Sequence, residues 1–245
     1  MQFSRVLRSL ALCVCALWAV AASAQEKTGI KEGFELKPGT VRIVLMRPTV
    51  RVGEQSTGGL FEPNADWTAQ ARENITAELA KVQDSLGNIV IEYDDSSTAD
   101  AALVGQYRNL FGSVAASVIE YQFFAGNRLP TKKKDKNRFD WSIGPGVANL
   151  ESLNGADYLL FINTHDAYGS TGRKALQIVG LLAGVPVIAG EHVGNAGLVD
   201  ARTGELVWLN ADRQMGGDVR TPEGAAKRVS QLFEGFPGRT EEEGK

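Results

Sequence analysis

The two histidines of the chain are its best candidates for metal binding or acid–base chemistry. His165 is followed by Asp166, and His192 is preceded by Glu191. Imidazole and carboxylate groups are common zinc ligands, so these residues could form a ligand set if the two segments met. The spacing does not force that meeting, whereas two histidines four residues apart on one helix would. We therefore expect two surface histidines and no metal. A metal-dependent hydrolase using His165, Asp166 and His192 remains the alternative.

Residues 168–174, Tyr-Gly-Ser-Thr-Gly-Arg-Lys, partly match a phosphate-binding loop. A Walker loop needs a Gly, four further residues and then Gly-Lys-Ser/Thr, so that backbone amides surround the phosphates and the hydroxyl reaches magnesium. Here Ala167 stands at the first Gly, Arg173 follows the second, and Ala175 replaces the hydroxyl. We predict no nucleotide site, no cofactor and, more generally, no catalytic residues.

A basic run lies in the middle of the chain, next to Phe139 and Trp141. Such a run can bind phosphate, an acidic polymer or anionic headgroups, but a short run in an acidic chain is more often a solvated loop. We expect the loop and keep its cations as candidate interaction residues. They are Lys132, Lys133, Lys134, Lys136 and Arg138.

Residues 175–190 form the most apolar internal stretch, with Gln177 as its one strongly polar residue. Gly and Pro interrupt it, and it is too short to cross a bilayer as one helix. The favoured interpretation is a core helix that turns into a strand. The alternative is an exposed apolar flap, with Leu181 and Leu182 contacting an oligomer partner or, peripherally, a membrane.

Three tryptophans allow a further alternative, a periplasmic domain that binds a small molecule or glycan. Trp67, Trp141 or Trp208 could each stack against a sugar ring. Large aromatic side chains more often anchor a core. We expect that role for Trp67 and Trp208.

Residues 1–24 have the pattern of a secretory signal peptide. Arg5 and Arg8 precede an apolar run, and Ala22-Ser-Ala24 supplies small residues before a cleavage site at Gln25. Leu12 and Val14 precede the two cysteines where a lipidation signal needs a small residue, so we expect no lipid anchor. Both cysteines would leave with the signal peptide, which excludes disulfides and thiolate chemistry from the mature protein. The predicted location is the periplasm.

The charge of the mature chain argues against nucleic acid as a partner. Loss of Arg5 and Arg8 from 26 basic residues leaves 24 against 29 acidic ones, a net charge of −5. An acidic surface has no general attraction for a polyanion.

Residues 197–209 predict a β-hairpin around which the remaining segments can be arranged. Two apolar runs flank Asp200-Ala-Arg-Thr-Gly204, in which Asp200 can accept backbone N–H bonds and Gly204 can adopt a positive φ. We predict one α/β domain over 41–236, with helices packed on a mixed sheet of about five strands and a C-terminal hairpin followed by a helix. Further expectations are a flexible lead (25–40), strands (41–46, 88–93, 157–162), a long loop (48–65), helices (67–86, 98–124, 145–153, 221–233) and a disordered tail (237–245). We expect the centre of the 88–93 strand to be buried, the apolar face of the 98–124 helix to include Leu103 and Leu110, and Thr221 to cap the last helix.

This order of elements resembles a group of bacterial envelope domains, the curli-secretion (CsgG-type) lipoproteins and the N-terminal domain of TolB. The matching segments are Val41 to Met46, Gly155 to Leu160 and Leu198 to Trp208, within a resemblance that covers about residues 41–235. The lipid-attachment Cys of that group is missing here. The resemblance implies a non-enzymatic accessory role in envelope assembly or transport, with envelope proteins or further copies of the chain as partners.

Overall fold

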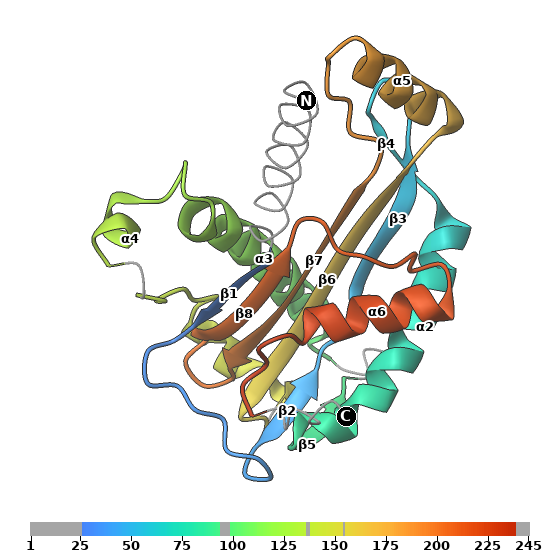
Figure 1. The fold of residues 1–245 in the computed structure, drawn as a ribbon. Helices are drawn as coiled ribbons and strands as arrows, with labels where there is room; N and C mark the ends of the chain where they lie inside the picture. Colours follow the sequence, from blue (N-terminus) through green and yellow to red (C-terminus); the bar gives the residue numbers. More distant parts are fainter. Residues whose placement is uncertain (1–25, 94–98, 136–137, 154, 239–245) are drawn as a thin grey trace, which may run out of the picture.

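The computed structural model describes residues 26–93, 99–135, 138–153 and 155–238, and it confirms the predicted α/β class. The sheet is mixed and has eight strands in the described residues, more than the five expected, in the order β1-β8-β7-β6-β2-β5, with β3 paired to β6 and β4 to β3 (Figure 1). The strands are β1 (Glu26–Ile30), β2 (Arg42–Leu45), β3 (Thr49–Gln55), β4 (Phe61–Pro63), β5 (Ile89–Glu92), β6 (Tyr158–Gly169), β7 (Glu191–Asp200) and β8 (Leu206–Asp212). The α-helices are α2 (Ala65–Val82), α3 (Ala101–Val118), α4 (Pro130–Lys134), α5 (Thr171–Leu182) and α6 (Pro222–Leu232).

Four shorter helical turns occur in the described residues. A 3-10 turn, Gln83–Leu86, extends α2, and a π-helical turn, Ile119–Phe123, extends α3. The predicted helix over 145–153 is two 3-10 turns, Pro145–Asn149 and Glu151–Leu153. The predicted signal peptide and most of the predicted tail lie outside the described residues. Among those described, no helix combines the length and hydropathy needed to cross a bilayer.

Strand β6 is the centre of the sheet, as its continuous apolar sequence predicts. It pairs in parallel with β2 and β3 and antiparallel with β7. Leu159 and Leu160 have no exposed surface. The strand also runs seven residues beyond the predicted end at 162, because the polar residues from Asn163 onward alternate between the two faces of the sheet and pair with β3.

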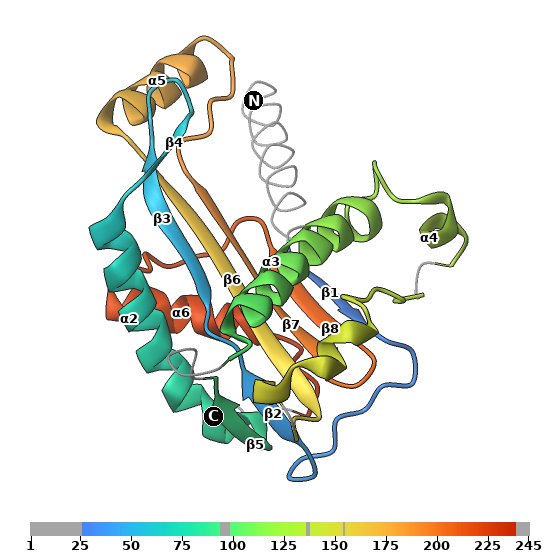
Figure 2. The ribbon, with the colours of Figure 1, turned by 180° about the vertical axis from the view of Figure 1, so that it is seen from behind.

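Helices cover both faces of the sheet, which gives three layers. Helices α2 and α6 pack on one face (Figure 1), and α3 packs on the other (Figure 2). Alternate side chains of β6 supply both cores. Leu160 and Ile162 join Trp208 in the core under α2 and α6, whereas Leu159 and Phe161 join the core under α3.

The C-terminal hairpin and the helix that follows it are confirmed. Strands β7 and β8 pair from Gly194↔Asp212 to Val199↔Leu206. In the turn, Asp200 Oδ1 accepts hydrogen bonds from the backbone of Arg202 and Thr203, and Gly204 has a φ of 71°. The predicted cap of α6 is also present, since the Thr221 hydroxyl accepts from Gly224 N.

Two segments predicted to be irregular are paired strands. Residues 48–65 contain β3 and β4, because the alternation of Thr49 to Val52 builds a strand and the glycines at 58 and 59 serve only as the turn between the two. The segment predicted as a flexible lead contains β1, which pairs along the outer edge of β8. These three strands contain Gly or charged residues with low β propensity, so propensity alone did not indicate them.

Two predicted burial patterns are wrong. Strand β5 was expected to have a buried centre, but it is the last strand of the sheet and Ile89 is 56% exposed. On α3 the predicted apolar face included Leu103 and Leu110, which are exposed, whereas Val104 and Phe111 are buried. Apolar residues occur around much of this helix, so periodicity alone did not decide which side meets the sheet.

Candidate functional site

The most exposed apolar surface among the described residues is formed by α5 and the segment that returns from it to β7. We call residues 171–190 the flap. It lies beyond the ends of the long strands β3, β6 and β7, at one end of the molecule (Figures 1 and 2). Leu181 is 78% and Leu182 is 84% exposed. The favoured prediction of a core helix is therefore wrong, and the alternative of an exposed flap describes this segment.

Local sequence explains the shape of the flap. The Ser170 hydroxyl caps α5 by accepting from Arg173 N at 3.1 Å, and Gly184, with a φ of 72°, reverses the chain after the helix. A Cβ on Gly180 would lie 2.6 Å from the carbonyl oxygen of Val185, so only glycine lets the helix and the return segment approach this closely. The apolar side chains that this pairing cannot bury remain exposed. They are Leu176, Ile178, Val179, Leu181, Leu182, Val185 and Ile188.

Polar contacts hold the flap together and attach it to the body. Arg173 Nε donates to Ile188 O at 2.9 Å and so joins the two segments of the flap, whereas its Nη1 donates to Thr57 O in the β3–β4 turn of the body at 3.3 Å. Gln55 Oε1 accepts from Gly190 N at 2.9 Å. Leu60, in the same turn, is 73% exposed and adds to the apolar end of the molecule. Gly180 is the one buried residue of α5.

An apolar hollow of about 540 Å³ lies between α5 and the return segment. Ile178, Leu181, Val185 and Val187 are among the residues that line it. A concave apolar surface next to exposed leucines is the pattern of a contact site, because soluble proteins rarely leave such area uncovered.

The predicted basic loop holds fewer free cations than its sequence indicates. Part of it is the short helix α4, and Lys132 is 4% exposed. Its ammonium group donates to Arg138 O and pairs with Asp140, which also accepts from Arg138 Nε at 2.6 Å. Hydrogen bonding from Lys132, opposed by burial, leaves the pKa of Asp140 below its usual value. Lys133 and Lys134 are exposed, and Lys136 lies outside the described residues.

Only part of the alternative metal-ligand set comes together, since His192 meets Asp166 but His165 does not. His165 and Asp166 are successive residues of β6, so their side chains lie on opposite faces of the sheet. The His165 ring packs 4.5 Å from the Phe61 ring, and burial lowers the pKa of His165. Over the described ranges, no group of three His, Cys, Asp or Glu side chains is arranged to hold a metal ion.

Asp166 and His192 belong instead to a buried polar cluster. Its central residue, Arg228, was not identified from the sequence. Arg228 of α6 is fully buried and forms two hydrogen bonds with the Asp166 carboxylate, at 2.7 and 2.8 Å. His192 Nδ1 lies 2.8 Å from Asp166 Oδ1, and the Thr164 hydroxyl also bonds the carboxylate. Arg228 stands between Ala225 and Leu232 on the apolar face of the helix, and that position was the available signal.

The remaining sequence candidates serve structural roles. Trp208 has no exposed surface and so offers no platform for a sugar ring. Trp67 is partly buried against the core beneath the Arg220 guanidinium, 4.5 Å from its ring centre. The Trp141 indole donates to Gln122 Oε1. The stretch that partly matched a Walker loop spans the end of β6 and the start of α5, where Ser170 caps the helix.

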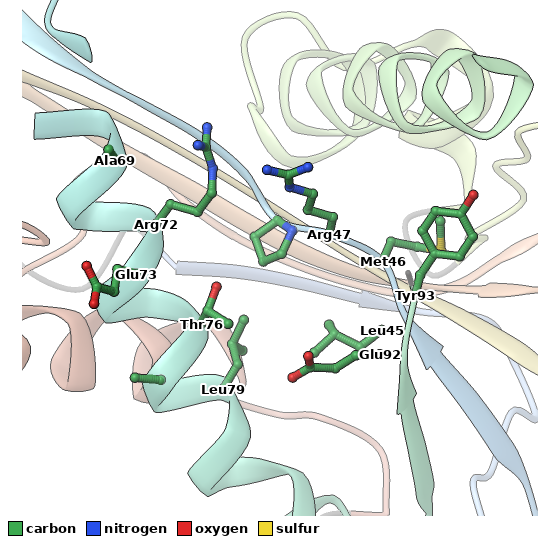
Figure 3. Close-up of a pocket in the computed structure, with 12 residues that line it drawn as sticks. Leu45, Met46, Arg47, Ala69, Arg72, Glu73, Thr76, Leu79, Glu92 and Tyr93 are labelled. Carbon is green, nitrogen blue, oxygen red and sulfur yellow. The ribbon is translucent and has the colours of Figure 1, made fainter. Parts of the chain in front are cut away.

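A second hollow of about 600 Å³ lies between α2 and the ends of β2 and β5 (Figure 3). Arg47 and Arg72 point to the same side of it in Figure 3, while Glu73 and Glu92 also line it. Two positive and two negative side chains balance, so the lining favours no class of charged ligand.

Comparisons with known proteins assign no function. A scan of protein families gives no match, and a search of curated proteins also gives none. Among solved structures, a dodecamer of a PelC point variant from Paraburkholderia phytofirmans is 12% identical, with a TM-score of 0.36 over 87% of this chain and 99% of that one. A second PelC dodecamer from the same organism is 12% identical, with a TM-score of 0.34 over 88% and 99%.

Proposed function

We propose that this protein is an exported accessory protein of the bacterial cell envelope, which acts by contact rather than by catalysis. The observation that carries the proposal is the flap, which presents apolar side chains at the end of an otherwise well-packed domain. Exposed area of this kind is costly in water and is typical of a surface that another component covers. The N-terminal sequence pattern and the resemblance to CsgG-type and TolB N-terminal domains support an envelope location.

The geometry of the polar residues supports a contact role more than an enzymatic one. Asp166 is held by Arg228 in the protein interior, and its neighbour His165 lies on the other face of the sheet. A hydrolase would need such groups to converge on a substrate. The flap, by contrast, is accessible without any rearrangement.

The test is site-specific photo-crosslinking in cells that export the protein. A photo-reactive amino acid replaces Leu182 in one strain and Ile89 in another, since Ile89 is 56% exposed on β5 at the opposite end of the molecule (Figure 1). We expect the mature, processed protein and adducts to an envelope component from position 182 but not from position 89. Absence of export, or equal labelling from the two positions, would contradict the proposal.

A further inference from the structure

We infer that the flap binds the surface of a phospholipid bilayer, and this inference rests on the proposed function because it names the component that covers the flap. The apolar side chains face outward on both segments of the flap, and Leu60 is exposed in the adjoining turn. A protein partner would need a surface that matches the shape of this end. The interfacial region of a bilayer needs no preformed matching surface to accept apolar side chains.

The shape of the molecule permits this contact. The flap lies beyond the strand ends in both views, so a flat surface can reach it without meeting the body of the domain (Figures 1 and 2). Helix α5 has 12 residues, which corresponds to about 18 Å of helix, too short to span the hydrocarbon core. It can therefore lie in the headgroup region and extend leucine and isoleucine side chains toward the acyl chains.

The charges at this end fit a phosphate-rich surface. Residues 56–60 and 171–190 contain Arg173 and Lys174 but no acidic residue, although acidic residues outnumber basic ones in the whole chain. Lys174 is exposed and can contact lipid phosphates. Glu62 and Glu191 are exposed on the strands just behind the flap. Because carboxylates resist transfer from water, we expect them to set the depth at which insertion stops.

Vesicle binding by the exported, processed protein tests the inference. The predicted mature chain has no cysteine, so Leu182→Cys can carry an environment-sensitive fluorophore, with Ile89→Cys as the matched control. Vesicles of phosphatidylethanolamine and phosphatidylglycerol should shift the emission to shorter wavelength at position 182 only. In sedimentation with the same vesicles, Leu182→Asp should lower the affinity about 10-fold or more, whereas Ile89→Asp should not.

Three results would overturn the inference and leave the proposed function standing. In the first, vesicles are not bound while crosslinks from position 182 to an envelope protein persist. In the second, Leu182→Asp converts a lipid-free oligomer to a monomer, which would make a second copy the occupant of the flap. Equal vesicle binding by the wild-type chain and Leu182→Asp would also overturn it, since binding would then come from another part of the protein.

Discussion

Arg228 of α6 and Asp166 of β6 form a two-fold hydrogen-bonded ion pair, and neither side chain has any exposed surface. The pair joins the last helix to the central strand across a separation of 62 residues. Burial alone would raise the pKa of Asp166, but hydrogen bonds from His192 and Arg228 hold it below the usual value. The carboxylate is therefore charged in the folded protein and depends on these neighbours.

Removal of the arginine should leave that charge without compensation. We expect Arg228→Met to lower the free energy of unfolding by about 3–5 kcal/mol, because it isolates a buried carboxylate. Urea denaturation followed by circular dichroism measures the change. Arg202→Ala is the matched control, since Arg202 pairs with Asp200 at the surface and should cost about 0–1 kcal/mol. Equal losses of unfolding free energy in the two variants would show that the buried pair contributes no more to stability than the surface pair.

Acid should weaken the contribution of Asp166 to stability. Its folded pKa is depressed, so its stabilising effect is complete above the unfolded value of 3.8 and is lost as the pH falls through the folded pKa. We expect the wild type to exceed Asp166→Asn most in unfolding free energy near neutral pH, with the difference shrinking below about pH 4. Urea titrations of both proteins at a series of pH values measure it. A difference that stays constant with pH would contradict this explanation.

The turn of the C-terminal hairpin should not tolerate a side chain at Gly204. Its φ is 71°, and a Cβ there would lie 2.0 Å from the carbonyl oxygen of Gly144. Gly204→Ala should destabilise the fold by more than about 2 kcal/mol, the sum of backbone strain and displacement of the 144 segment. Gly33→Ala separates the two causes, because Gly33 has the same φ of 71° and open space around it, and should cost only about 1 kcal/mol. Thermal denaturation of both variants gives the comparison.

Charge on the flap should not affect folding. Leu182 is 84% exposed, so we expect Leu182→Asp to change the free energy of unfolding by less than about 0.5 kcal/mol. Leu198→Asp is the contrasting variant, because Leu198 is completely buried in β7 and the substitution should abolish folding. The measurement is denaturation in the absence of lipid and partner. A large loss for Leu182→Asp would mean that the flap packs against the body in solution.

Elements with a strong apolar run or a defined cap could be predicted from the sequence. Strand β6, the β7–β8 hairpin and helices α2 and α6 have such signals, and the structure confirms each of them. Strands β1 and β4 could not be predicted in this way. They are short edge strands whose own sequences have low β propensity. Pairing with β8 and β3 holds them extended.

The candidate site was predictable in residue type but not in its surroundings. The apolar composition of residues 175–190 was clear from the sequence. Whether these residues pack in a core or are exposed depends on how far β6 and β7 extend beyond the body. The same long-range dependence hid the Asp166–Arg228 pair, since only the docking of α6 on the sheet brings the two residues together. Local periodicity places Arg228 on the buried face of α6, but it does not identify Asp166 as the partner or show that residues 175–190 are exposed.

The pairing of β1 with β8 has a consequence for how the chain reaches its native state. Glu26 lies opposite Asp212, so the first strand of the described residues has the last strand, β8, as its only strand neighbour there. A chain that crosses a membrane from its N-terminus would deliver β1 first and leave it without that neighbour until almost the whole polypeptide has followed. Closure of such a long loop is slow compared with local turns. If the chain is exported in this way, this edge of the sheet should assemble after translocation ends, and a chaperone that holds extended segments would act there.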